Sequence, residues 1–243
     1  MPVLETLTAS DLRLAVTRFR DALRDHQEEL NRLNVYPVPD GDTGTNMMLT
    51  LESVAAELKT AETMDEVCKA IAHGSPMGAR GNSGVISSQL LRGACEVLGE
   101  QRPGGPLTTA ALARLLRRAS DLGYEAVAHP VEGTILSVAR AAAECAEAAE
   151  ADGEPVETAM QAAVEGARRA LARTPEQLES LARAGVVDAC GTGLVIVLEC
   201  LGELVSGIRR SPAVFAAPAA SALDLQELQA DPATHHYGGP AYE

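Results

Sequence analysis

Two carboxylates stand two residues apart in a proline-fixed loop that spans residues 34–47 and reads NVYPVPDGDTGTNM. Asp40 and Asp42 flank Gly41, so a tight turn can aim both side chains at one point. Carboxylate oxygens in this arrangement suit a hard divalent cation, which they can hold against phosphate oxygens. The loop therefore predicts a metal and phosphate site just ahead of an apolar helix.

The residues that follow supply groups for the phosphate itself. Gly44 allows the backbone to approach a ligand, while Thr45 and Asn46 can offer a hydroxyl, an amide and helix-start N–H groups to an anion. The alternative is a helix connection that is only rich in capping and turn residues. The density of oxygen ligands, together with three further loops of similar type, favours a functional site.

The second loop, GARGNSGV, contains Gly81, Asn82, Ser83 and Gly84. Its glycines permit close backbone approach, and Asn82 or Ser83 can cap the next helix, whose free N–H groups would face an anion. It is not a Walker A loop, because no GKS or GKT follows and no strand precedes it.

Two later loops also place glycine and oxygen-bearing residues at a helix start. The HPVEGTIL segment places Gly133 and Thr134 at a helix start, and the VVDACGTGL segment does the same with Asp188 and Gly191. Four loops rich in glycine and oxygen, each opening a helix, would converge at one end of a barrel whose consecutive helices run up and down.

Periodic apolar residues predict eight or nine helices and no strand, and hence an all-α fold. Thr63 and Glu66 have the spacing of a capping box, and Gly74 is expected to end the helix that they begin. After Arg209 the helical periodicity is lost, so residues 209–243 are expected to form a linker. The predicted helices span about 10–33, 46–58, 63–74, 85–98, 112–122, 134–149, 155–173, 175–185 and 194–208.

Composition excludes several classes of protein. The net charge of −14, without a run of Lys or Arg, argues against a nucleic-acid surface. The five cysteines include no Cys-x-x-Cys pair, which argues against a disulfide framework or zinc site and favours a reducing, cytoplasmic location. No signal peptide is recognisable, and charged residues interrupt every long apolar segment, so no transmembrane segment is expected.

The motifs NVYPVPDGDTGTNM, GARGNSGVI, PVEGTIL and VVDACGTGL, in this order and spacing, resemble the N-terminal kinase domain of bacterial fatty acid kinase. That domain is similar to the nucleotide-binding L subunit of dihydroxyacetone kinase. The resemblance covers about residues 5–208 and implies an eight-helix antiparallel up-and-down barrel with ATP or ADP and two Mg²⁺ ions at its mouth. It also implies that Thr45 and Asn46 face phosphate. Together with the loop residues above, the predicted nucleotide site is formed by Gly44, Thr45, Asn46, Gly81, Asn82, Ser83, Gly84, Gly133, Thr134, Asp188 and Gly191.

The resemblance assigns the Mg²⁺ ions to Asp40 and Asp42, which would act in catalysis through the metal. Two positions depart from the family pattern. Cys190 replaces a glycine of the fourth motif, and Asn34 stands near the place of a third metal-binding aspartate of dihydroxyacetone kinase subunits. Asn34, or a carboxylate from elsewhere, is therefore the candidate for a third ligand.

The implied reaction is transfer of the γ-phosphoryl group of ATP to a fatty acid presented by a separate fatty-acid-binding protein, giving an acyl phosphate. Residues 1–208 would form the nucleotide-binding domain, and residues 209–243 would lead to a middle domain outside this sequence. The chain alone is then expected to be weak or inactive on acyl substrate. A dihydroxyacetone (glycerone) kinase subunit and a non-catalytic nucleotide-binding module are the alternatives, and acyl-chain preference and homodimer formation stay open.

Overall fold

The computed structural model describes residues 6–101 and 105–207, and these residues contain helices but no strand. The all-α prediction is confirmed. The expected linker at 209–243 lies outside the described residues. The helices are α1 (Ala9–Asp25), α2 (Gln27–Leu33), α3 (Thr43–Glu57), the 3-10 turn η1 (Leu58–Thr60), α4 (Met64–Gly78), α5 (Gly81–Glu100), α6 (Thr109–Glu125), α7 (Ile135–Ala151), α8 (Val156–Ala172), α9 (Thr174–Gln177), α10 (Glu179–Ala184) and α11 (Ala189–Ser206).

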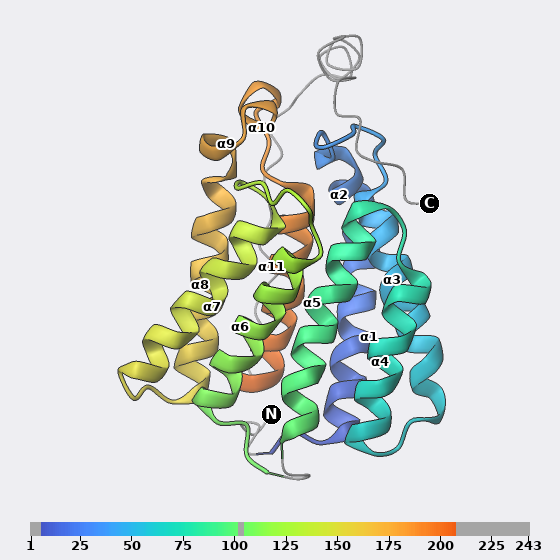
Figure 1. Ribbon diagram of the computed structural model, residues 1–243, viewed down its shortest axis with the longest axis vertical. Coiled ribbons are helices and arrows are strands. Elements are labelled where there is room, and N and C mark those ends of the chain that lie inside the picture. Colours follow the sequence, from blue (N-terminus) through green and yellow to red (C-terminus); the bar gives the residue numbers. More distant parts are fainter. Residues whose placement is uncertain (1–5, 102–104, 208–243) are drawn as a thin grey trace.

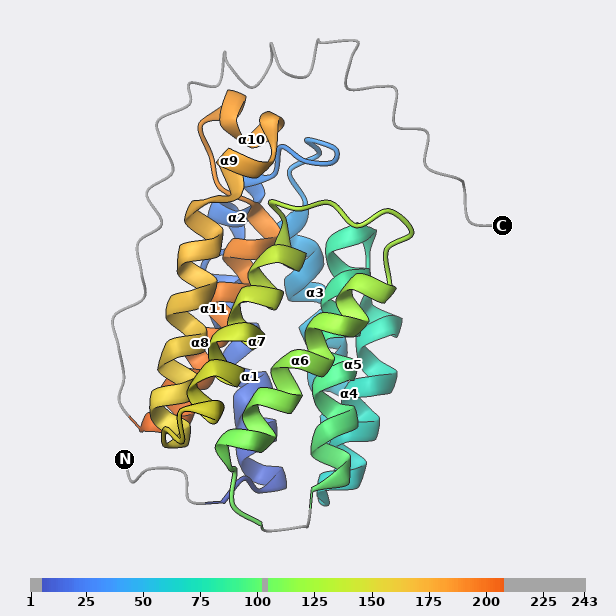
Figure 2. The ribbon, with the colours of Figure 1, turned by 60° about the vertical axis from the view of Figure 1, so that its left-hand side comes forward.

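The long helices pack side by side in chain order, with α3 against α4, α4 against α5, and so on to α8 (Figures 1 and 2). Helix α11 packs against both α8 and α1, and α1 packs against α3, so the order of contacts closes on itself. The short helices α2, α9 and α10 lie together at one end (Figure 1). Because consecutive long helices alternate in direction, the loops that carry the four motifs also lie at that end, called here the motif end.

The core is built from aliphatic side chains on one face of each helix. Leu23 and Leu30, for example, are 1% and 0% exposed. Aromatic residues make up only 2% of the chain and so contribute little to this core. Between α7 and α8 the packed residues are small, and their burial lets the two helix backbones approach closely. The fully buried alanines of this contact are Ala143, Ala146, Ala159, Ala163 and Ala167.

Several predicted boundaries were wrong. The single helix expected over 10–33 is divided at His26, whose backbone N–H closes α1 on the Ala22 carbonyl while α2 begins at the next residue. Gly74 does not end α4, because the helix continues to Gly78. It is instead a contact glycine, since a Cβ there would lie 3.0 Å from the Cα of Val54. The helix expected over 175–185 forms the two short helices α9 and α10.

Helix α11 is long and apolar enough, by length and composition alone, to cross a membrane. Half of that segment is buried in the fold, where α11 packs against α1, α7 and α8. Its apolar character therefore matches a central core helix.

Candidate functional site

A buried asparagine shapes the loop that carries the two aspartates. The Oδ1 atom of Asn34 accepts hydrogen bonds from the backbone N–H groups of Asp42 (3.2 Å) and Thr43 (3.1 Å) and from the Thr43 hydroxyl (2.8 Å). Its Nδ2 atom donates to the Val38 carbonyl at 2.9 Å. Asn34 therefore shapes the loop through its side chain. Its role as a metal ligand stays a prediction, and a metal ion would have to compete with three donors for the same oxygen.

Asp40 and Asp42 face one another across this loop. Gly41 has φ +66°, a left-handed conformation that favours glycine and permits the tight turn. Burial raises the pKa of the Asp40 carboxyl, and the charge of Asp42 together with a hydrogen bond between the two carboxyl groups raises it further. A cation between them would relieve this repulsion. In the described part of the chain, no group of three or more His, Cys, Asp or Glu side chains is arranged to hold a metal ion.

Helix α2 holds Thr45 in the first turn of α3. Asn31 Oδ1 accepts from the Thr45 backbone N–H at 3.2 Å, and the Thr45 hydroxyl accepts from Gln27 (2.9 Å) and Asn31 (3.1 Å). A Cβ on Gly44 would lie 2.4 Å from the Gln27 carbonyl oxygen. Gly44 therefore allows α2 to pack closely against α3. The N–H groups of Thr43 and Thr45 are already bonded to Asn34 and Asn31, so they are not free to bind an anion.

The start of α5 is different. Arg80 is the N-cap residue and makes no side-chain capping bond, so the predicted caps Asn82 and Ser83 were wrong. Gly81 has φ +58°, and a Cβ there would lie 2.9 Å from Nδ2 of Asn46. The first N–H groups of an α-helix have no acceptor within the helix, so those of α5 are available to a ligand beside Asn46 and the aspartate loop.

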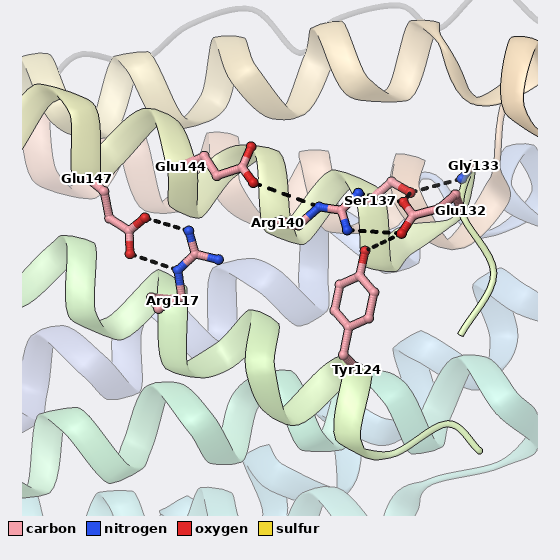
Figure 3. Close-up of polar contacts among 8 residues, drawn as sticks. All are labelled: Arg117, Tyr124, Glu132, Gly133, Ser137, Arg140, Glu144 and Glu147. Atoms are coloured by element: carbon pink, nitrogen blue, oxygen red, sulfur yellow. Dashed lines mark hydrogen bonds and ion pairs between the residues drawn. The ribbon is translucent and has the colours of Figure 1, made fainter. Parts of the chain in front are cut away.

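The third motif is held by an ionic network that the sequence did not indicate (Figure 3). Glu132 accepts hydrogen bonds from Arg140 (2.9 and 2.6 Å), from the Ser137 hydroxyl (2.6 Å) and from the Tyr124 hydroxyl (3.2 Å). The Ser137 hydroxyl in turn accepts from the Gly133 N–H at 2.9 Å. The network thereby ties the loop before α7 to the end of α6.

The network favours an ionised Glu132 and a protonated Tyr124. Burial alone would raise the pKa of Glu132, but the hydrogen bonds from Ser137 and Arg140 outweigh it and lower that pKa. Burial, followed by the charge of Glu132, raises the pKa of Tyr124 to about 12. The guanidinium of Arg140 also lies 5.3 Å from the centre of the Tyr124 ring, a distance that allows a cation–π contact.

The fourth motif begins with a buried acid. Asp188 is 3% exposed, and its carboxylate accepts from the backbone N–H of Gly191 at 2.6 Å. Its own N–H donates to the Thr174 hydroxyl at 3.1 Å. Burial raises the pKa of Asp188 to about 7, although the nearby backbone N–H groups of Gly191 and Ile135 oppose the rise. The predicted role of Asp188 and Gly191 in contacting a nucleotide stays untested, but both lie inside the fold.

Contacts between the loops bring the four motifs together. Cys190 Sγ lies 4.0 Å from the Thr43 hydroxyl, which joins the fourth motif to the first. Burial raises the pKa of the Cys190 thiol, and the charges of Asp188, Asp42 and Asp40 raise it further. This thiol is therefore a poor nucleophile. Asn46 joins the first motif to the second. A Cβ on Gly191 would lie 3.0 Å from Val138 of α7, so the fourth motif packs against the helix that follows the third.

Sequence reasoning missed Gln27, Asn31, Glu132 and Arg140. Gln27 and Asn31 stand four residues apart and so share one face of α2, a signal of an aimed polar pair. Glu132 lies within the HPVEGTIL motif itself, next to the glycine that was singled out.

A family profile described as "DAK2 domain" matches residues 37–203. The chain is 44% identical over 179 residues to "Protein YloV" of Bacillus subtilis (strain 168), which covers 73% of this chain and 32% of that protein. It is 41% identical over 179 residues to an uncharacterized protein of Staphylococcus epidermidis, with the same shares. The chain therefore spans about a third of the length of these relatives.

Two solved structures have a similar fold. The dihydroxyacetone kinase from C. freundii in complex with AMP-PNP and Mg²⁺ matches with a TM-score of 0.54 at 21% identity, over 83% of this chain and 35% of that one. The native form of that kinase matches with a TM-score of 0.56 at 22% identity, over 79% of this chain and 34% of that one. At this identity the likeness concerns the fold.

Proposed function

The chain belongs to the DAK2 domain family, and we propose that it is the Mg²⁺- and ATP-binding domain of a kinase that phosphorylates a fatty acid. The observation that carries the proposal is the position of the Asp40–Asp42 pair. The pair lies in the loop that Asn34 holds in place. It precedes Asn46, which lies against the uncapped start of α5. A cation ligand set and an anion site thus lie next to one another.

The ligand set fits Mg²⁺ with a nucleotide. Magnesium commonly takes one or two carboxylates from the protein and completes its shell with water and substrate phosphates, so two aspartates without a third acidic ligand suffice. The structurally similar dihydroxyacetone kinase was solved with AMP-PNP and Mg²⁺, which supports the same ligands here. We propose two ions, in keeping with the sequence resemblance.

Each part of the site would have a separate task in phosphoryl transfer. Asp40 and Asp42 would hold Mg²⁺, which neutralises phosphate charge when bound. The first N–H groups of α5, at Gly81, Asn82 and Ser83, would donate to phosphate oxygens. The remaining predicted contacts, at Gly84, Gly133 and Thr134, would then line the site through the backbone or by packing. A Cβ on Gly84 would lie 3.1 Å from the Thr50 hydroxyl, which favours packing there.

We propose that the acceptor carboxylate comes from a fatty acid carried by a separate binding protein. The motifs that resemble fatty acid kinase support this acceptor, while the matched dihydroxyacetone kinases keep dihydroxyacetone as the second candidate. Because the chain spans a third of its relatives, the acceptor site is expected to need segments outside this sequence. The proposed location is the cytoplasm.

Nucleotide binding is tested first with paired glycine variants. In Gly81→Ala the new Cβ meets Asn46 and the backbone must hold φ +58°, so Mg-ATP affinity should fall about tenfold or more. Gly99→Ala is the matched control, because a Cβ there meets nothing within 4 Å. Calorimetry should show unchanged binding for the control. Equal Mg-ATP affinity of the two variants would show that the phosphate does not bind at the start of α5.

The acceptor is tested by turnover of the longest available form of the protein. ATP consumption is measured with fatty acid on its binding protein, with free fatty acid, and with dihydroxyacetone. Turnover only with the loaded binding protein supports the proposal. Turnover with dihydroxyacetone would assign the second candidate, and nucleotide binding without turnover on any acceptor would assign a non-catalytic module.

A further inference from the structure

Arg80 is the only Lys or Arg residue in the four motifs. It stands at the N-cap of α5, where its backbone carbonyl accepts from the Gly84 N–H at 3.0 Å. The residue is exposed, and its side chain makes no capping bond to α5. A single cation at the helix start that is proposed to receive phosphate therefore requires an explanation other than capping of that helix.

The guanidinium of Arg80 bonds to two neutral carbonyls at the end of α4. Its Nη1 atom donates to the Ala79 carbonyl at 2.9 Å and to the Met77 carbonyl at 3.4 Å. A cation is favourable there, because the last carbonyls of a helix lack a donor within the helix and carry the negative end of its dipole. Arg140, in contrast, pairs with the carboxylate of Glu132 at 2.6 Å. In the part of the chain that the structure describes, no carboxylate pairs with Arg80.

Contacts of the neighbouring residue place this cation beside the aspartate loop. A Cβ on Gly81 would lie 2.9 Å from Nδ2 of Asn46, which belongs to the first turns of α3, just after Asp42. Gly81 is itself exposed, so the start of α5 is open to solvent. A phosphate bound by the first N–H groups of α5 would lie next to the residue that precedes them. The side chain of Arg80 is exposed, so it can change rotamer to face that phosphate without repacking the core.

A phosphate would compete successfully with the two carbonyls for this guanidinium. A hydrogen bond between arginine and phosphate is charge-assisted and about twice as strong as a bond between neutral groups, and the planar fork allows two such bonds at once. Both carbonyls are held by Nη1 alone, so a phosphate that engages the fork gains contacts which the end of α4 does not provide.

We propose that Arg80 is a catalytic residue whose guanidinium leaves the end of α4 and binds the γ-phosphoryl group of ATP. This inference rests on the proposed nucleotide-binding function and adds to it the group that distinguishes ATP from ADP. In the transfer, an acceptor oxygen bonds to the γ-phosphorus while the bond from that phosphorus to the bridging oxygen breaks, and ADP leaves with the electron pair. Arg80 neither gives nor takes a proton, and its charge stabilises the transferring group.

The test measures the affinities of the full 243-residue chain for Mg-ATP and for Mg-ADP by calorimetry. Arg80→Gln keeps an amide that can donate to the carbonyls at the end of α4 but removes the charge. Affinity for ATP should fall about tenfold or more, while affinity for ADP should stay within about threefold of the parent, because ADP has no γ-phosphoryl group. A purely structural role of Arg80 would lower both affinities by the same factor.

Arg173→Gln is the matched control. Arg173 is also exposed, lies between α8 and α9 at the motif end, and pairs with Glu176 at 3.3 Å. Its replacement removes the same unit of charge, so a general electrostatic effect on nucleotide binding would appear in both variants. Both affinities should be unchanged in this control. Arg80→Lys restores the charge without the planar fork, and its ratio of ATP to ADP affinity should lie at least threefold below that of the parent.

The ratio of ATP to ADP affinity decides the proposal. A ratio in Arg80→Gln within threefold of the parent, or an equal fall in Arg173→Gln, would overturn the role of Arg80 and leave the proposed function standing. If Arg80→Gln fails to fold, Arg80→Lys decides, and a ratio equal to that of the parent would contradict the proposal. A parent chain that binds neither nucleotide would overturn the proposed function, and the role of Arg80 with it.

Discussion

The two ends of the helix bundle begin their helices in different ways. At the end away from the motifs, α1 and α4 start with capping boxes, Thr8 with Asp11 and Thr63 with Glu66. Helix α6 starts with the hydroxyl of Thr108. Each of these bonds joins residues three positions apart, so the caps form from local sequence alone.

At the motif end, where Thr134 and Asp188 also cap α7 and α11 locally, other contacts of the helix starts come from residues farther away. Asn34 caps Thr43 from nine residues upstream, and Asn31 reaches Thr45 across fourteen. The N–H of Asp188 donates to the Thr174 hydroxyl across fourteen residues, and α5 has no side-chain cap. The comparison shows that the site is placed by tertiary contacts. Its geometry is therefore defined only in the folded molecule, while the opposite end serves stability through local bonds.

The largest effect is expected from removing one carboxylate of the pair. Asp42→Asn should lower Mg-dependent ATP affinity about a hundredfold, because a single carboxylate holds the cation poorly. Stability should not fall, since the repulsion that raises the pKa of Asp40 is also removed. The control is Asp65→Asn at the opposite end, where an exposed carboxylate pairs with Lys69 at 2.6 Å. ATP affinity is measured by calorimetry with and without Mg²⁺. Equal affinities of Asp42→Asn and the parent chain would show that Asp42 is not a metal ligand.

A second prediction concerns acidification. The pKa of Asp188 is raised from 3.8 to about 7 in the fold. Between these values the folded chain holds a proton that the unfolded chain lacks, so this group adds stability as the pH falls and loses it as the pH rises through about 7. From pH 7.5 to 5.5 the gain should be about 2 kcal/mol, on the scale of 1.4 kcal/mol per pKa unit.

The measurement compares the free energy of unfolding of the parent with that of Asp188→Asn at each pH. Glu132 and Glu147 have lowered pKa values and act in the opposite sense, but they are the same in both proteins and cancel in the difference. A difference that stays constant with pH would show that Asp188 remains ionised throughout, held by the Gly191 N–H.

The same contrast explains what the sequence could predict. Helix-period apolar residues and the Thr63 capping box are local, and they predicted the all-α fold and most elements. The division at His26 was missed because apolar periodicity continues through it, while the turn is fixed by contacts of α2 with Thr45. Glu132 was missed because its partners Tyr124 and Arg140 meet it only after folding. The four motifs were found because glycine and oxygen-bearing residues mark helix starts in sequence.

The smallest effect is expected from a local cap at the opposite end, and it tests whether the two ends are independent. Thr63→Ala removes the hydroxyl that accepts from the Glu66 N–H at 3.3 Å, so the free energy of unfolding should fall by about 1 kcal/mol. In a domain of this size that corresponds to a lower Tm by about 2–4 °C. Mg-ATP affinity should stay the same, because Thr63 begins α4 at the end opposite the motif loops. Asn34→Ala is the counterpart at the motif end, where one lost acceptor frees two backbone N–H groups and the Thr43 hydroxyl. It should lower both stability and affinity. A loss of affinity in Thr63→Ala as large as that in Asn34→Ala would mean that the bundle transmits strain along its full length, and the division of tasks between the two ends would have to be abandoned.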